Sequence, residues 1–163
     1  MITLKNERDE HAPAIERLLD ASFGESRWHK TCQRLREGQA PIRNLSLVAL
    51  GRGALVGTVR LWPVLAGRRR ALLLGPLAVD PAWRDQGVGA ALMAEALRRA
   101  KGEGEKSVIL VGDEEYYGRF GFAPNATTGL YLPGPVDRAR FLANEFVPGA
   151  LTGAEGDVRP LAA

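Results

Sequence analysis

One stretch of the chain carries the clearest chemistry, an apolar run that leads into a turn of the form Arg-x-x-Gly-x-Gly. The apolar run begins at Leu77, and the turn is built on Arg84, Gly87 and Gly89. An amphipathic helix is expected to follow at once, so several backbone N–H groups would be free at the positive end of its dipole. Such amides bind phosphate oxygens, and glycines let those oxygens approach closely. The sequence therefore predicts a site for a diphosphate.

Two other phosphate-binding motifs fit this turn less well. A Walker loop has the pattern G-x-x-x-x-G-K-[ST], which this sequence does not contain. A dinucleotide fingerprint has the pattern G-x-G-x-x-G, but here Gly87-Val88-Gly89 is followed by Ala90-Ala91-Leu92, so the third glycine is missing. The preceding Arg84 and the position in the middle of the chain, after a predicted hairpin, also argue against a dinucleotide fold.

The elements that would position this turn are indicated by the spacing of apolar residues. The expected helices span residues 9–23, 27–37, 88–101 and 114–120. The expected strands span residues 1–4, 45–50, 54–62, 71–79, 107–111, 130–132 and 140–147, and no pattern is readable after Pro148. This order predicts an α/β (α+β) fold around a mixed, mainly antiparallel sheet, with one βαβ crossover that encloses the glycine turn.

The bulk composition is typical of a single globular domain with one core. The chain has 163 residues, of which 45% are hydrophobic and 25% charged. No run approaches the ~18 apolar residues that a membrane helix needs. Charged residues within the first nine positions argue against a secretory signal. The lone Cys32, which is expected in the core, favours a cytoplasmic location. A net charge of +3 without a basic, aromatic-rich stripe argues against nucleic-acid binding, and no His/Cys spacing predicts a metal.

A second segment, Tyr117-Gly118-Arg119-Phe120-Gly121-Phe122, extends the pattern. Together with the Arg84–Gly89 loop, the strand leading into it and the element order, this segment resembles the GNAT superfamily of N-acetyltransferases. More narrowly, residues 111–124 and 132–136 resemble the YhbS-like predicted acetyltransferases. The resemblance covers residues 2–146 and implies one GNAT-like domain at 1–147, with a tail of uncertain structure at 148–163. It also implies a cofactor cleft where the fourth and fifth strands splay apart.

The resemblance implies that acetyl-CoA is the cofactor. Pro76 removes a backbone donor from the strand 71–79, so pairing is expected to break there, and by resemblance the pantetheine arm lies in that gap. Its amides would pair with Leu77 and Val79, as an added strand does, and the N–H near Leu77 would polarise the thioester carbonyl. The implied cofactor-binding residues are Leu77, Ala78, Val79, Arg84, Asp85, Gln86, Gly87, Val88, Gly89, Ala90 and Tyr117.

The predicted catalytic group is Tyr117, which by resemblance stands where the family carries a catalytic or CoA-contacting tyrosine. Direct acyl transfer consumes a neutral amine and releases a thiolate. A tyrosine with a pKa near 10 stays protonated at neutral pH and can supply the proton that the thiolate needs. Tyr116 is the alternative acid. The base stays open among Asp80, Glu25, Glu145 and a chain of water molecules.

The predicted reaction moves an acetyl group from acetyl-CoA to the amine of a small molecule or peptide, by direct attack in a ternary complex. The alternatives are another acyl-CoA donor and a non-catalytic CoA-binding or regulatory module of the same fold. By resemblance the acceptor site is formed by the first two helices and the C-terminal strands. Candidate lining residues are Arg27, Trp28, Trp62 and Phe141, although the two tryptophans are more typical of core anchors. A homodimer is also allowed, with no membrane partner.

Overall fold

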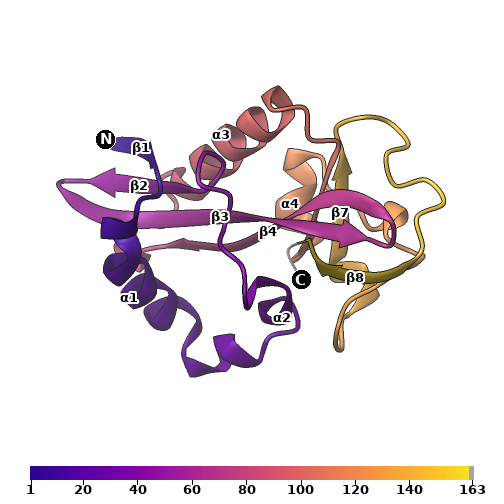
Figure 1. Cartoon of the computed structure of the whole chain (residues 1–163). Helices are drawn as coiled ribbons and strands as arrows, with labels where there is room; N and C mark the ends of the chain where they lie inside the picture. The colour runs from indigo at the N-terminus through magenta and orange to yellow at the C-terminus, as the bar shows by residue number, and fades with distance from the viewer. Residues whose placement is uncertain (162–163) are drawn as a thin grey trace.

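The computed structural model describes residues 1–161, and its centre is an eight-stranded sheet with the strand order β1-β2-β3-β4-β5-β7, joined by β8 and β6 (Figure 1). The strands are β1 (Ile2–Asn6), β2 (Leu47–Gly51), β3 (Ala54–Ala66), β4 (Arg69–Val79), β5 (Ser107–Val111), β6 (Leu130–Tyr131), β7 (Phe141–Glu145) and β8 (Gly156–Pro160). Neighbouring strands are antiparallel except for the pairs β4–β5 and β6–β8. The predicted mixed, mainly antiparallel sheet is therefore confirmed.

Two long helices cover the two faces of this sheet. The α-helices are α1 (Ala12–Phe23), α2 (Gln33–Arg36), α3 (Val88–Gly102) and α4 (Glu114–Tyr117). Helix α1 buries Ile15 against Val48, whereas α3 packs on Leu47 and Ala49, and side chains of adjacent strand residues point to opposite faces. In Figure 1, α1 lies below the sheet and α3 above it. Within residues 1–161, no helix is both long and apolar enough to cross a membrane.

The predicted helix at residues 27–37 is wrong. A 3₁₀ turn occupies Glu25–His29, the backbone is extended at Lys30, and α2 has only four residues. The turn is held by Arg27, whose side chain reaches Asp20 at 3.0 Å and Glu16 at 3.1 Å. This arrangement leaves Trp28 50% exposed, so it is not the core anchor that the sequence predicted.

The segment after Pro148, whose structure could not be read from the sequence, contributes a strand to the sheet. Strand β8 pairs with the end of β3, and Val158 lies opposite Ala66. The pattern was unreadable because Val158 is the one buried residue of this strand, which leaves too few apolar positions to show a period. Leu151, which lies before β8, is buried in the core beside it.

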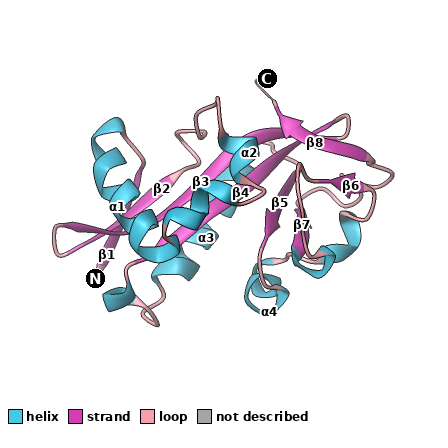
Figure 2. Cartoon of the chain, turned by 90° about the horizontal axis from the view of Figure 1, so that it is seen from below, coloured by secondary structure: helices cyan, strands magenta, loops and turns pink. Residues whose placement is uncertain are grey.

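Strands β4 and β5 pair over only a short length. Their parallel register comprises Leu72 opposite Val108 and Leu73 opposite Ile109. Beyond Leu73 the two strands separate, and on the other side of β4 the register with β3 shifts as well. Figure 2 shows β5 and β7 running away from the long strands β3 and β4. The predicted break near Pro76 and the predicted splay between the fourth and fifth strands are confirmed.

Candidate functional site

The glycine turn is exposed and immediately precedes α3. Gly87 is the N-cap of this helix, with a φ of 79° that L side chains rarely adopt. Asp85 also has a left-handed φ, 62°. None of the described residues offers a backbone carbonyl to the amides of residues 85–90. The turn therefore presents a group of free N–H donors at a helix N-terminus, which is an arrangement that binds a phosphate or diphosphate.

The open edge of β4 follows from its hydrogen bonding to β3. The amide of Asp80 donates to the carbonyl of Val56 at 2.8 Å. The backbone N–H and C=O groups of alternate strand residues point to the same side. Those of Leu77 and Val79 therefore point away from β3, toward the side from which β5 has separated. An extended ligand that carries amides can pair with these groups. Ala78, in contrast, is buried against α1.

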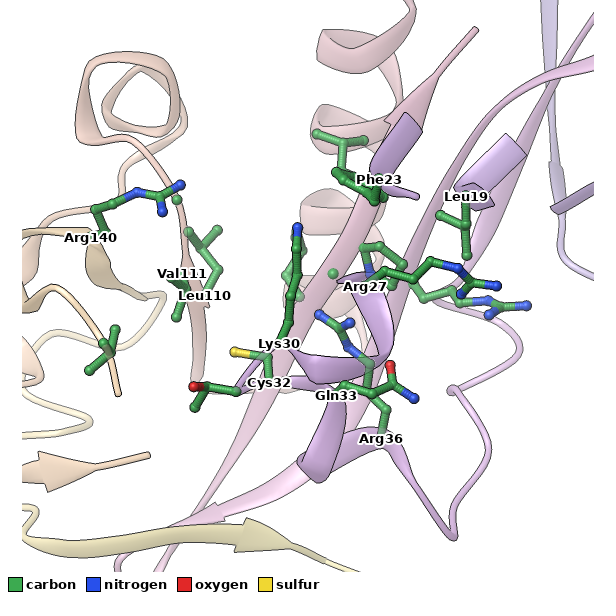
Figure 3. Close-up of a pocket in the computed structure, with 18 of the residues that line it drawn as sticks. Leu19, Phe23, Arg27, Lys30, Cys32, Gln33, Arg36, Leu110, Val111 and Arg140 are labelled. Atoms are coloured by element: carbon green, nitrogen blue, oxygen red, sulfur yellow. The ribbon is translucent and has the colours of Figure 1, made fainter. Parts of the chain in front are cut away.

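A cavity of about 710 Å³ lies where β4 and β5 diverge. Its floor includes β4 from Leu74 to Leu77, and its far wall includes the end of β5, Tyr116 and Tyr117. The segment that joins α1 to α2 closes the remaining side (Figure 3). Of the predicted cofactor residues, Leu77 and Tyr117 line this cavity, whereas those of the glycine turn do not.

The glycine turn and the cavity meet at Gly89. A Cβ atom added to Gly89 would lie 3.0 Å from the hydroxyl oxygen of Tyr116 and 3.6 Å from Cγ2 of Val79. Tyr116 also lines the cavity, so one side chain spans the boundary between the two parts of the site. The glycine turn, the open edge of β4 and the cavity therefore form one continuous path.

Tyr117 is held firmly at the cavity wall. Its ring lies on the backbone of Gly112, where an added Cβ would be 2.3 Å from Cε2 of the ring, and it contacts Tyr116 and Phe122 edge-on. Burial, followed by the nearby Tyr116 and Asp113, raises the pKa of Tyr117 to about 12. Its hydroxyl therefore remains a proton donor throughout the neutral range.

The structure does not bring the three candidate bases to the cavity. Asp80 accepts a hydrogen bond from a backbone amide at 2.8 Å, and Glu145 does the same at 2.8 Å. Glu25 lies in the 3₁₀ turn, outside the cavity lining. The carboxylates that do line the cavity are Glu16, Asp113 and Asp137. Within residues 1–161, no group of three His, Cys, Asp or Glu residues is arranged to hold a metal ion.

Three of the four candidate acceptor-site residues line the cavity, namely Arg27, Trp28 and Trp62. Trp62 is also a core anchor, as predicted, and its indole N–H donates to the carbonyl of Gly75 at 2.6 Å. Phe141 is fully buried in the core and does not reach the cavity.

Sequence reasoning missed Lys30 and Arg36, two cations of the cavity wall. No local pattern distinguishes them, because charged residues on a predicted amphipathic helix usually face solvent. Both residues line the cavity because residues 24–36 lie beside β4, a contact between segments that are distant along the chain.

Comparisons with known proteins give consistent matches over most of the chain. A model of the acetyltransferase (GNAT) family matches residues 12–122. The uncharacterized N-acetyltransferase YhbS of Escherichia coli K12 is 33% identical over 148 residues, which cover 89% of this chain and 87% of that protein. The crystal structure of E. coli YhbS in complex with CoA has a TM-score of 0.80 at 30% identity, covering 98% of this chain and 89% of that one. A GNAT family acetyltransferase from Brucella melitensis in complex with acetyl-CoA has a TM-score of 0.74 at 28% identity, covering 99% and 97%.

Proposed function

The chain belongs to the acetyltransferase (GNAT) family, and on that basis we propose that it transfers an acetyl group from acetyl-CoA to the amine of a small molecule or peptide. The attack takes place directly, with both substrates bound. The observation that carries this proposal is the continuous path from a turn of free amides, along the open edge of β4, to a cavity walled by a protonated tyrosine. The two relatives whose crystal structures contain CoA or acetyl-CoA support the choice of donor.

The groups along this path fit the successive parts of acetyl-CoA. The free amides of residues 85–90 match its pyrophosphate, with Arg84 exposed at the border of the turn. Gly87 and Gly89 place no Cβ between these amides and the phosphate oxygens. The polar groups of Leu77 and Val79 match the amides of the pantetheine arm. The thioester would then lie at Leu77, where the open edge meets the cavity.

In the proposed reaction, two groups of the chain act on the thioester. The N–H of Leu77 donates to the carbonyl oxygen and stabilises the negative charge that develops there when the amine attacks. The Tyr117 hydroxyl donates its proton to the departing sulfur, since its pKa of about 12 keeps it protonated. The proton lost by the amine leaves through water, and the Tyr117 phenolate regains a proton from water. Of the cavity carboxylates, Glu16 and Asp113 are held in ion pairs and Asp137 accepts a hydrogen bond from the amide of Ala139.

Two measurements test this function in sequence. Calorimetry with acetyl-CoA is expected to show binding, and no binding at high micromolar acetyl-CoA would refute the choice of donor. A panel of amines is then assayed by release of CoA, with propionyl-CoA and succinyl-CoA as competing donors. CoA release that depends on an added amine supports the transferase. Tight binding without such release would instead indicate a non-catalytic CoA-binding module.

We also propose that the enzyme works in the cytoplasm. Cys32 is a free cysteine and is buried in the core, as the sequence predicted. Free thiols persist in reducing compartments. Formation of a homodimer stays a prediction.

A further inference from the structure

The wall of the cavity carries more positive than negative side chains. The cations that line it are Arg27, Lys30, Arg36, Arg60 and Arg140. Three of them have carboxylate partners within 3.1 Å, in the pairs Arg27–Glu16, Arg60–Glu7 and Arg140–Asp113. The remaining cavity carboxylate, Asp137, accepts a hydrogen bond from the backbone amide of Ala139 and is not in one of these ion pairs. Among the described residues, Lys30 and Arg36 are therefore the cavity cations that have no carboxylate partner.

Arg36 is partly buried beside β4, near the point where β4 leaves β5. Its Nε atom is buried and has no hydrogen-bond partner. Its Nη2 atom lies 2.8 Å from the place that a Cβ on Gly75 would occupy, so the guanidinium rests against the backbone of β4. Arginine remains charged in proteins, and a buried charge without a partner is unfavourable. A site with this character fits an anion that the chain itself does not provide.

Lys30 adds a second unpaired charge to the same wall. Its ammonium lies 4.2 Å from the ring centre of Phe23. Burial lowers the pKa of Lys30, and the nearby guanidinium groups of Arg36 and Arg140 lower it further. Figure 3 shows the side chain of Lys30, before α2, and that of Arg36, at the end of α2, on the same side of the cavity. An anion placed between them would relieve their mutual repulsion.

We propose that the acceptor is an amino acid, whose carboxylate is bound by Arg36 with support from Lys30. This inference rests on the proposed acetyltransferase function and names its substrate class. Gly75, against which Arg36 lies, is two residues from Leu77, and two residues of chain span at most about 7 Å. A carboxylate bound at Arg36 therefore leaves an amine a few bonds away within reach of a thioester held at Leu77. The planar guanidinium fork suits a carboxylate in particular.

Binding is the primary test because it does not depend on turnover. The protein saturated with CoA is titrated with N-acetylglycine, N-acetylleucine and N-acetylphenylalanine, and in parallel with their C-terminal carboxamides. At least one carboxylate is expected to bind about tenfold or more tightly than its carboxamide, since it makes charge-assisted bonds. Equal affinity within every pair, or no carboxylate binding at millimolar concentrations, would overturn the inference.

Variants of Arg36 test whether this residue is the one that binds the carboxylate. Arg36→Gln is expected to weaken carboxylate binding about 10- to 100-fold and to leave carboxamide binding unchanged. The carboxylate affinity of Arg36→Lys should lie between those of the wild type and Arg36→Gln. Arg34→Gln is the matched control, because Arg34 is on the same short helix but donates to the carbonyl of Pro133, outside the cavity lining. The melting temperature of Arg36→Gln should not fall, since a partly buried charge without a carboxylate partner is removed. Equal weakening of both ligand classes, or a fall in melting temperature that accounts for the lost binding, would overturn the assignment.

Failure of this inference can be distinguished from failure of the proposed function. If amines without a carboxylate are acetylated as fast as amino acids, the transferase stands and the amino-acid acceptor is refuted. If carboxylate binding depends on Arg36 but no amine releases CoA, the carboxylate site stands and the transferase is refuted.

Discussion

The substitution Gly112→Ala tests the position of Tyr117 without altering its chemistry. The added Cβ would lie 2.3 Å from Cε2 and 2.8 Å from Cδ2 of the Tyr117 ring. Carbon atoms in contact are separated by about 3.5 Å or more, so the ring must move by roughly 1 Å. Gly112 is not among the glycines with a left-handed φ, so its backbone accepts alanine and the expected effect is purely steric.

The size of the effect on each property follows from this displacement. Forcing a methyl group into a packed wall costs about 1–3 kcal/mol of folding free energy, measured by urea unfolding. A misplacement of about 1 Å at a catalytic group lowers kcat about 100-fold, measured as release of CoA at saturating acetyl-CoA. The affinity for acetyl-CoA should change much less than kcat, because the glycine turn proposed to bind the pyrophosphate belongs to another segment.

The matched control is Gly118→Ala, close to the same tyrosine. A Cβ on Gly118 would find its nearest atom at 3.9 Å, and its φ is −58°, so alanine should leave kcat unchanged and stabilise the chain by about 0.5–1 kcal/mol. Two results would refute the reasoning. One is a folded Gly112→Ala protein with the kcat of the wild type. The other is a further loss of kcat when Gly112→Ala is added to Tyr117→Phe, since effects that act through one group should not add.

Four further outcomes are expected. Tyr117→Phe should lower kcat by about 100-fold or more with little change in the affinity for acetyl-CoA, and an unchanged kcat would remove Tyr117 from the role of acid. Because the pKa of Tyr117 is raised to about 12, the acid is lost only as the pH rises through that value; the kcat profile should therefore rise as the amine loses its proton and show no descending limb near pH 10. Gly87→Val should abolish acetyl-CoA binding in calorimetry while the far-UV circular dichroism stays native, because its φ of 79° strains a β-branched residue by about 1–2 kcal/mol and the side chain obstructs the turn. Arg98 and Arg99 lower the pKa of Glu95 from 4.5 to about 2. Glu95→Gln should therefore lower the free energy of unfolding by less than about 1 kcal/mol at pH 7. Urea unfolding should show this difference between the two proteins shrinking as the pH falls from 4.5 toward 2.

The features predicted well from sequence are those whose cause is local. The missing N–H of Pro76 indicated the break in β4, and the spacing of Gly87 and Gly89 indicated a turn of free amides at the start of α3. The period of α3 indicated the helix behind that turn, and the family resemblance based on these motifs is confirmed. The roles assigned to the individual site residues stay predictions.

The features that sequence reasoning missed depend on contacts between distant segments. Arg27 is paired with residues of α1, and this pairing replaces the predicted helix 27–37 with a 3₁₀ turn and turns Trp28 outward. Strand β8 is defined by pairing with β3, not by its own composition. Arg36 is partly buried because β4 passes beside it at Gly75, and no spacing along the chain indicates that approach.

The separation of β4 from β5 makes this a sheet with an unfilled edge in its interior. Unpaired strand edges are templates on which other chains can associate. In the proposed complex, the pantetheine arm occupies that edge, so the cosubstrate would act as the strand that the fold omits. Its supply would then set the resistance of the protein to unfolding and association, adding about 2.7 kcal/mol of stability at 100 times its dissociation constant.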